Sequence, residues 1–474
     1  MKFIDNYLRS LLNEYVDKGY TRLMRDQYTE NLFEMVPATK KAGPINLVEL
    51  AMRAAKGLPV SRPLGSHLKL SPWEKLLFNP VHLYRFPTPE NVSISTAVTI
   101  GRKAHRPLTV AIPLLIAAMS FGGALSKKAK IALAKGATLA GTATNSGEAG
   151  LLEEEREAAR LFIGQYNRGG WMNTPEKYKR LDAIEIQLGQ GAQGSSPQRT
   201  SGKNIGPDFQ KVFQLKKGQE AQIRSRLPGV NSVQEFVALV RKLQKETGVP
   251  VGLKIAATHH LEKELEIALE AGVDFVTVDG AEGGTHAGQT VLEDDVGLPT
   301  LYALNRAADF FKKNGVFGEV NLIAAGGLIT PGQMLKALAL GADCVYLGTA
   351  AVMALVGEQI VGSQPFEPPV SMVIYNGKLT DKLDVDKAAR SLFRFLNASV
   401  SEMEAVCYSL GKTALRDIDK SDLCTLDPFL AKATGIQLGH IAPEEQDSYF
   451  REFSFCHPEP EVFNSTRQEQ QFLQ

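Results

Sequence analysis

The run that decides the fold is Ile323-Ala324-Ala325-Gly326-Gly327, an apolar segment ending in paired glycines, with Thr330-Pro331 opening a helix just beyond it. The next unit repeats this layout, because the apolar run Cys344-Val345-Tyr346-Leu347 ends in Gly348-Thr349-Ala350. Phosphate binds where backbone N–H groups converge, free of side chains, at the positive end of a helix dipole. In an eightfold α/β barrel, the loops after the last two strands often form such a site. The two units therefore predict a barrel that holds a phosphorylated ligand, with a plain tight turn after each strand as the alternative.

An internal repeat supports this architecture. Helical patterns that end at Gly136, Gly272 and Gly341 each run directly into a short apolar strand. Glycine at these positions tolerates the left-handed conformation that ends many helices. Repeated units with nearly continuous apolar strands indicate a parallel sheet covered by helices, and counting them gives eight. A closed (β/α)8 TIM barrel is therefore expected rather than a doubly wound sheet. The predicted strands lie near residues 114–121, 142–146, 160–166, 183–189, 250–256, 274–279, 320–325 and 343–348.

The regions on either side of the predicted barrel differ from it in composition. The barrel is expected over residues 106–375, and residues 1–105 mix short helical patterns with proline-punctuated, irregular chain. We expect this N-terminal segment to form a helical and irregular layer packed against the barrel. Residues 376–440 predict a C-terminal helical extension, and residues 441–474 a polar tail. The first residues predict an amphipathic helix, and the early Asp5 argues against a secretory signal.

Charge and cysteine content argue against several classes of protein. The formal net charge is +1, so neither nucleic acid nor an anionic membrane is implied as a partner. The four cysteines are scattered, which argues against a metal site or a disulfide framework and for a reducing, cytoplasmic compartment. No stretch of the sequence is long and apolar enough to span a bilayer. The sequence leaves the oligomeric state open, and a homo-oligomer is one of the options.

Residues at the carboxyl ends of the predicted strands indicate the chemistry. They are mostly amides and small residues, and we expect inward-facing amides to suit a flat heteroaromatic ring with several carbonyls. Lys254 interrupts the apolar run of strand five, and a buried lysine is costly unless it meets an anion. A reduced flavin carries negative charge around its N1 and C2 carbonyl, which would stabilise the ammonium. The alternative is a lysine at the barrel rim, in water.

Seven motifs occur in the same order as in the FMN-binding barrel of glutamate synthase, and over about residues 110–356 the chain resembles that family. They are Ala118-Met119-Ser120-Phe121-Gly122, Asn145-Ser146-Gly147-Glu148, Gln190-Gly191-Ala192, Gly252-Leu253-Lys254, Gly283-Gly284-Thr285, Gly326-Gly327-Leu328 and Gly348-Thr349-Ala350. Seven motifs in order are much more specific than a single pair of glycines.

The resemblance implies an FMN site and a hydride-transfer reaction. It implies that reduced flavin passes a hydride to the imine formed from a 2-oxo acid and ammonia. Glu148 falls at an acid of the family near that reaction. The expected catalytic set adds Lys254 and His286, a histidine close to the flavin at a position where the family pattern has a glycine. The cofactor-binding residues implied are Met119, Ser120, Asn145, Gln165, Lys254 and Gly284 around the flavin, and Gly326, Gly327, Gly348 and Thr349 at its phosphate.

The sequence also departs from the family's pattern. The positions of the family's cluster-binding cysteines are Gly357, Ser363 and Pro368 here, so no iron–sulfur cluster is expected. Met1 is followed by Lys2 rather than by the nucleophilic cysteine of the amidotransferase domain, and no G-x-G-x-x-G unit is present to bind NADPH. We therefore expect electrons to come from an external donor, either a separate reductase protein or a diffusing nicotinamide.

Departures near the substrate concern the loop after strand four. The family has a lysine-rich, glycine-rich loop there, and this chain has neutral residues that include Gln187 and Gln193. An amino acid or 2-oxo acid remains the expected substrate, but 2-oxoglutarate itself becomes doubtful. The predicted substrate-contacting residues are Gln187, Gln190, Gln193, Arg226, His259 and His286. For the histidines the alternative is helix capping or loop hydrogen bonding, and for Arg226 it is an ordinary surface position.

Several function classes stay open from the sequence. The first is an FMN-dependent oxidoreductase acting on the CH–NH2 or imine group of an amino acid or 2-oxo acid. The second is a non-redox, FMN-dependent isomerase on the same barrel. The third is an inactive subunit that binds flavin for structure.

Overall fold

The computed structural model describes residues 2–25, 35–62, 64–285, 288–359 and 368–454, and it divides the chain after Ser61 into two compact units. The first unit contains helices α1 (Lys2–Arg25), α2 (Met35–Ala42) and α3 (Pro44–Lys56). α3 begins with a proline and ends at Gly57, which adopts the left-handed conformation with φ of 59°. The helix expected at the start of the chain is thus present as α1.

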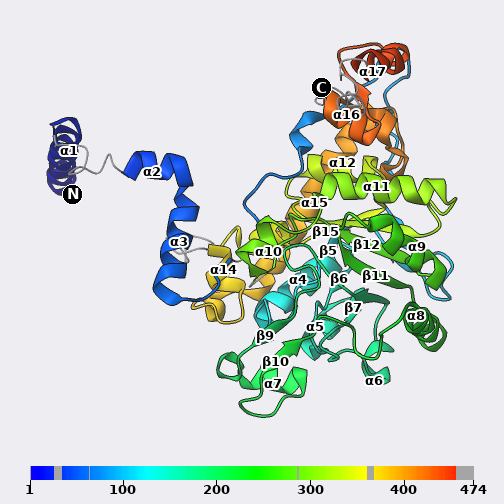
Figure 1. The fold of residues 1–474 in the computed structure, drawn as a ribbon, viewed down its shortest axis with the longest axis horizontal. Helices are drawn as coiled ribbons and strands as arrows, with labels where there is room; N and C mark the ends of the chain where they lie inside the picture. Colours follow the sequence, from blue (N-terminus) through cyan, green and yellow to red (C-terminus); the bar gives the residue numbers. More distant parts are fainter. Residues whose placement is uncertain (1, 26–34, 63, 286–287, 360–367, 455–474) are drawn as a thin grey trace, which may run out of the picture. The chain divides into compact units, whose positions relative to one another are not determined.

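Eight parallel strands form the centre of the second unit, and each matches a predicted strand (Figure 1). They are β5 (Leu114–Ile116), β6 (Thr144–Asn145), β7 (Phe162–Tyr166), β8 (Ala183–Gln187), β11 (Val251–Ala256), β12 (Phe275–Asp279), β14 (Asn321–Ala325) and β15 (Cys344–Leu347). Their hydrogen-bonded order is β5-β15-β14-β12-β11-β8-β7-β6. The predicted α/β barrel is therefore confirmed. β5 is shorter than expected, since the chain leaves the sheet after Ile116.

The seam between β5 and β6 is closed by a few specific hydrogen bonds. The backbone N–H of Ile116 donates to the Ala143 carbonyl at 3.0 Å, and the Thr142 hydroxyl donates to the Leu114 carbonyl at 2.7 Å. Further along the seam, the Lys130 ammonium donates to the carbonyls of Met119 at 2.6 Å and Asn145 at 2.8 Å. These contacts join the two ends of the sheet into a barrel.

Helices surround the strands and begin and end where the sequence favours it. Ser126 and Ser232 accept hydrogen bonds from the first turns of α4 (Lys127–Leu139) and α8 (Val233–Thr247). Gly248 and Gly272 adopt the left-handed conformation at the ends of α8 and of α9 (Leu261–Ala271). The other barrel helices are α5 (Glu153–Ala158), α6 (Pro175–Tyr178), α10 (Thr290–Asp294), α11 (Thr300–Lys313), α12 (Pro331–Ala339) and α13 (Thr349–Val356).

The amino end of the barrel is filled by a hairpin. β3 (Val98–Ile100) pairs antiparallel with β4 (Leu108–Val110), and their buried side chains pack with Leu115, Ile163 and Phe275 from the barrel strands. The Gly101 N–H donates to Asn321 Oδ1 at 2.9 Å, which fixes the hairpin to β14. The opposite, carboxyl end of the barrel is therefore the end available for a ligand.

The chain before the barrel and the C-terminal extension belong to the same unit. β16 (Leu423–Thr425) pairs antiparallel with β2 (Leu76–Phe78) and parallel with β17 (Gln437–Leu438), so residues 62–105 lie with the extension. The helices of the extension are α14 (Pro368–Val373), α15 (Val385–Ser409), α16 (Pro428–Thr434) and α17 (Gln446–Ser454). The predicted polar tail thus begins with a helix, and residues 455–474 lie outside the described part. Among the described residues, every helix is too short or too polar to cross a membrane.

An insertion of about 45 residues separates β8 from α8. It contains β9 (Gln198–Thr200), α7 (Pro207–Phe213) and β10 (Ala221–Ile223), and β9 pairs antiparallel with β10. Phe209 and Phe213 of α7 are buried in a cluster with Phe121, which follows β5. The insertion is therefore a packed substructure next to the carboxyl end of the barrel.

The packing of α15 on α4 makes a testable prediction at Gly136. A Cβ atom there would lie 2.7 Å from Leu392 Cδ2 and 3.1 Å from the Ala389 carbonyl oxygen. Overpacking of this kind costs about 1–3 kcal/mol, and we expect Gly136→Val to lower the free energy of unfolding by about that amount. Gly332→Val is the matched control, because its nearest atom is 4.0 Å away. Thermal and urea unfolding of both variants give the measurement. Equal losses of unfolding free energy in the two variants would contradict the close packing of α15 on α4.

Candidate active site

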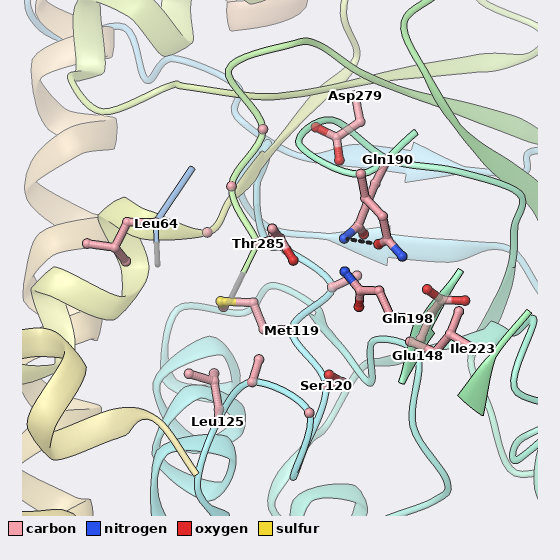
Figure 2. Close-up of a pocket in the computed structure, with 18 of the residues that line it drawn as sticks. Leu64, Met119, Ser120, Leu125, Glu148, Gln190, Gln198, Ile223, Asp279 and Thr285 are labelled. Carbon is pink, nitrogen blue, oxygen red and sulfur yellow. Dashed lines mark hydrogen bonds between the residues drawn. The ribbon is translucent and has the colours of Figure 1, made fainter. Parts of the chain in front are cut away.

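A cavity of about 370 Å³ opens at the carboxyl end of the barrel strands (Figure 2). Its lining combines short turns that follow the strands with part of the insertion after β8. The sequence-predicted residues that line it are Met119, Ser120, Glu148, Gln190, Gln193, Lys254, Gly284, Gly326, Gly327, Gly348 and Thr349. The fold thus gathers residues predicted from seven separate motifs around one cavity.

Other predicted site residues lie elsewhere. Asn145, Gln165 and Gln187 are buried in the barrel and do not line the cavity. Arg226 and His259 are exposed on loops and also do not line it, and for Arg226 this placement is the surface alternative. His286 lies outside the described residues.

A buried carboxylate that the sequence analysis missed explains the position of two amides. Glu185 is fully buried, and its Oε1 accepts hydrogen bonds from Asn145 Nδ2 at 3.1 Å and Gln165 Nε2 at 2.8 Å. Its Oε2 accepts a hydrogen bond from the Thr277 hydroxyl at 2.8 Å. The sequence analysis expected these amides to face a ligand ring. In the structure their side chains donate to a carboxylate of the barrel interior. Glu185 interrupts its apolar strand just as Lys254 does, so the signal was present in the sequence.

Lys254 has a carboxylate partner within the cavity. Its Nζ lies 2.8 Å from Asp279 Oδ2, and the two side chains are only 3% and 7% exposed. Burial lowers the pKa of Lys254, but the carboxylates of Asp279 and Glu185 more than offset it, so the net pKa is raised. The lysine is therefore an ammonium at neutral pH. The Nζ atom also lies 5.9 Å from the ring centroid of Tyr346, another residue of the cavity wall.

Glu148 is held by an arginine that the sequence analysis did not identify. Arg168 is fully buried, and its Nε and Nη2 donate to the two carboxylate oxygens at 3.1 and 2.9 Å. The bidentate contact fixes the carboxylate plane and balances its charge. No sequence pattern singles out Arg168.

The two glycine turns, after β14 and β15, differ in whether a side chain caps the helix that follows. Gly326 and Gly327 have φ of 114° and 68°, and a Cβ on either would clash with Thr300 or Glu282, as in an ordinary tight turn. The first turn of α12 is already satisfied by a capping box between Thr330 and Gln333. α13 begins after Gly348 with no side-chain cap, so no side chain of the N-cap residue satisfies its first N–H groups. Of the two turns, the one at α13 fits a phosphate better.

Comparison with known proteins settles the family. The family described as the conserved region in glutamate synthase matches residues 81–413, more than half of the chain. The chain belongs to the glutamate synthase family. The resemblance predicted from the seven motifs is thus confirmed, and with it the class of glutamate synthase-like oxidoreductases.

Individual relatives of this glutamate synthase-like chain differ in how much of it they cover. It is 30% identical over 400 residues to the glutamate synthase large subunit-like protein of Rhizobium meliloti (strain 1021), covering 80% of this chain and 90% of that protein. It is 28% identical over 313 residues to the archaeal-type glutamate synthase (NADPH) of Thermotoga sp. (strain RQ2), covering 66% of this chain. It spans only 62% of that second relative.

Solved structures show only a weak similarity. A mandelate oxidase structure has a TM-score of 0.48 and 15% identity, covering 73% of this chain and 86% of that one. The strand pairing described above establishes the barrel.

A second buried pair supports the cavity wall of this glutamate synthase-like barrel. Lys130 Nζ, which holds the Met119 and Asn145 carbonyls, also contacts Glu155 Oε1 at 2.9 Å, and both side chains are buried. Burial raises the pKa of Glu155 to about 7, although the neighbouring Lys130 lowers it. The pair ties α4 and α5 to the backbone of the cavity-lining residue Met119.

The Glu155 pKa predicts a pH-dependent stability. Between the ordinary pKa of 4.5 and about 7, the folded state holds a proton that the unfolded chain releases. Raising the pH through this window therefore lowers the free energy of unfolding by up to about 3 kcal/mol. We expect the stability advantage of wild type over Glu155→Gln to shrink by about this amount from pH 5 to pH 8, measured by urea unfolding. Glu157 is on the exposed face of α5, so the free energy of unfolding of Glu157→Gln should change with pH as it does in wild type. If the difference in free energy of unfolding between wild type and Glu155→Gln stays constant with pH, the raised pKa of Glu155 is refuted.

Proposed function

We propose that this chain is an FMN-dependent oxidoreductase acting on the carbon–nitrogen bond of an amino acid or of the imine of a 2-oxo acid. The observation that carries the proposal is the buried Lys254 ammonium, which lines the same cavity as the uncapped start of α13. A cation and a helix N-terminus in one cavity suit a ligand with an anionic ring at one end and a phosphate at the other. Membership of the glutamate synthase family supports the same assignment.

The lining residues fit FMN. Gly348 and Thr349 would bind the phosphate at the start of α13, with Gly326 and Gly327 beside them, and Lys254, Met119, Ser120 and Gly284 would lie around the ring. Asp279 Oδ1 accepts no hydrogen bond from the described residues, which leaves a buried acceptor available to a ligand donor. Bound FMN would supply two-electron hydride chemistry.

We assign separate roles to the charged residues. Lys254, kept protonated by Asp279, would stabilise negative charge on a reduced ring. In amine oxidation the substrate carbon loses a hydride and its nitrogen loses a proton, and Glu148 is the proposed acceptor of that proton. Imine reduction reverses both transfers. His286 remains a sequence-based candidate for the same proton transfer.

Electrons would be exchanged with an external carrier, either a separate protein or a diffusing nicotinamide. No iron–sulfur cluster is proposed as a relay, because Gly357, Ser363 and Pro368 replace the family's cysteines. Among the described residues, no group of three His, Cys, Asp or Glu side chains is placed to hold a metal ion.

The purified protein is expected to be yellow and to release FMN rather than FAD, since the glycine turns suit one terminal phosphate. Mass spectrometry of the released cofactor, after reconstitution if needed, is the measurement. Iron and acid-labile sulfide determined on the same anaerobic sample test the absence of a cluster. FAD, or failure to retain any flavin, would contradict the proposed cofactor.

Lys254→Met is expected to lower the flavin reduction potential and to slow turnover. The change keeps the apolar stem and removes the charge, and loss of one preorganised donor at a developing anion costs about a hundred- to a thousandfold in rate. Flavin potential and anaerobic reduction by amino acids give the readouts. Lys336→Met is the control, because this half-buried lysine lies outside the cavity. An unchanged potential in Lys254→Met would mean that the flavin binds elsewhere.

A further inference from the structure

Part of the cavity wall is aromatic and comes mainly from the insertion after β8. The apolar side chains on this part of the lining are Trp171, Phe209, Phe213, Ala221 and Ile223, which we call the apolar wall. Phe209 and Phe213 stack with ring centroids 4.0 Å apart, and Trp171 meets Phe213 edge-on at 4.6 Å. Since both phenylalanines are also packed into the buried cluster around Phe121, the wall is held in place.

The apolar wall is next to the residue proposed to move a proton. Figure 2 shows Ile223 and Glu148 on the same side of the cavity, away from Leu64. The glycine turns, which follow β14 and β15, and Lys254 of β11 fit FMN, and none of them belongs to the insertion. The space beside the apolar wall is therefore the part of the cavity left for a substrate.

Charges along the cavity disfavour a dicarboxylate. Three described carboxylates line it (Glu148, Asp279 and Glu282), against the two cations Lys254 and Arg199, and the buried Arg168, which does not line the cavity, balances Glu148. Lys254 is already paired with Asp279, which leaves exposed Arg199 as the lining cation without a carboxylate partner in the described part of the chain. A bound phosphate would add further negative charge. Two substrate carboxylates would need at least two free cations or equivalent donors, because burying an unpaired charge is costly.

The glutamines of the loop after β8 do not replace those cations. Gln187 Nε2 donates to Gln190 Oε1, and Gln190 Nε2 donates to Gln193 Oε1, each at 3.1 Å. Gln193 Nε2 in turn donates to the Ser196 carbonyl at 3.1 Å. One N–H of each amide is thus used within the loop. The chain of amides forms a neutral wall rather than a carboxylate clamp.

We propose that the substrate is an amino acid, or the corresponding 2-oxo acid, with an uncharged apolar side chain of aromatic or branched aliphatic type. This inference rests on the function proposed above and narrows its substrate class. The apolar side chain binds against the apolar wall, and a single carboxylate remains for Arg199 or backbone donors. In the oxidative direction the α-hydrogen leaves as hydride to FMN and one amine proton leaves to Glu148. The resulting imine is hydrolysed by water, and the two electrons pass to the external carrier protein or nicotinamide.

The test uses the FMN-loaded full chain under anaerobic conditions. L-phenylalanine, L-leucine and L-glutamate are compared as flavin reductants, and phenylpyruvate and 2-oxoglutarate as ligands that perturb the flavin absorbance spectrum. Burial of a large apolar side chain is worth about a ten- to hundredfold in affinity. We expect the apolar compounds to act at concentrations lower by about that factor.

A pair of variants locates the subsite. Ile223→Arg places a cation on the apolar wall and should weaken phenylpyruvate binding at least tenfold while improving that of 2-oxoglutarate. Leu139→Arg makes the same kind of change at an exposed side chain at the end of α4, outside the cavity, and should leave both affinities unchanged.

The outcomes separate this inference from the function on which it rests. If flavin binds and is reduced or perturbed only by glutamate and 2-oxoglutarate, the substrate class is wrong and the oxidoreductase stands. If apolar ligands bind but Ile223→Arg binds them like wild type, the apolar wall is not the subsite. If no flavin binds, or no compound of either kind reduces or perturbs it, the proposed function fails and this inference with it. If Ile223→Arg does not fold, the comparison of apolar compounds with glutamate and 2-oxoglutarate on the wild-type protein still tests the substrate class.

Discussion

The buried ammonium of Lys254 is the constraint on which the rest of the site depends. A charge inside a barrel is tolerated only when nearby groups replace its hydration, and here Asp279 at 2.8 Å does so, with Glu185 adding a favourable field. Removing one partner of a buried pair typically costs about 3–5 kcal/mol. The register of β11 against β8 and β12 places Lys254 beside Gln187 and Thr277. Because side chains alternate along a strand, a slip of one residue would turn the lysine into the helix layer.

Only the carboxyl end of the barrel is open to a ligand in the described part of the chain. The β3–β4 hairpin fills the amino end with apolar side chains, and Lys130 joins the β5 and β6 ends beside the cavity. A lysine can do this because its ammonium carries several donors and a charge, here hydrogen-bonded to two carbonyls and 2.9 Å from the Glu155 carboxylate. A hydrophobic residue at the same place would leave those carbonyls buried and unpaired.

The cavity has two parts of different origin. Short turns after β14 and β15 contribute glycines and the start of α13, where backbone groups dominate. The long insertion after β8 contributes Phe209, Phe213 and most of the neutral glutamine chain. We infer that the short turns and strand ends serve the cofactor, whereas the insertion sets which substrate fits. Loops of this kind vary without disturbing a barrel, because the strands carry the core.

The sequence by itself determined the number of strands, their order along the chain and the glycine turns, because these follow from local apolar periodicity and backbone conformation. A single charged residue in an apolar strand is visible without a structure, and both Lys254 and Glu185 are of this kind. The sequence analysis identified Lys254 and overlooked Glu185. Only the tertiary structure decided the partners. Gln165 reaches Glu185 because the register of β7 on β8 sets the two residues opposite each other, and Asn145 reaches it from β6, a geometry that no local pattern contains. The path of the long insertion after β8 is likewise set by packing at a distance, which is why Arg226 lies outside the cavity while Phe209 and Phe213 line it.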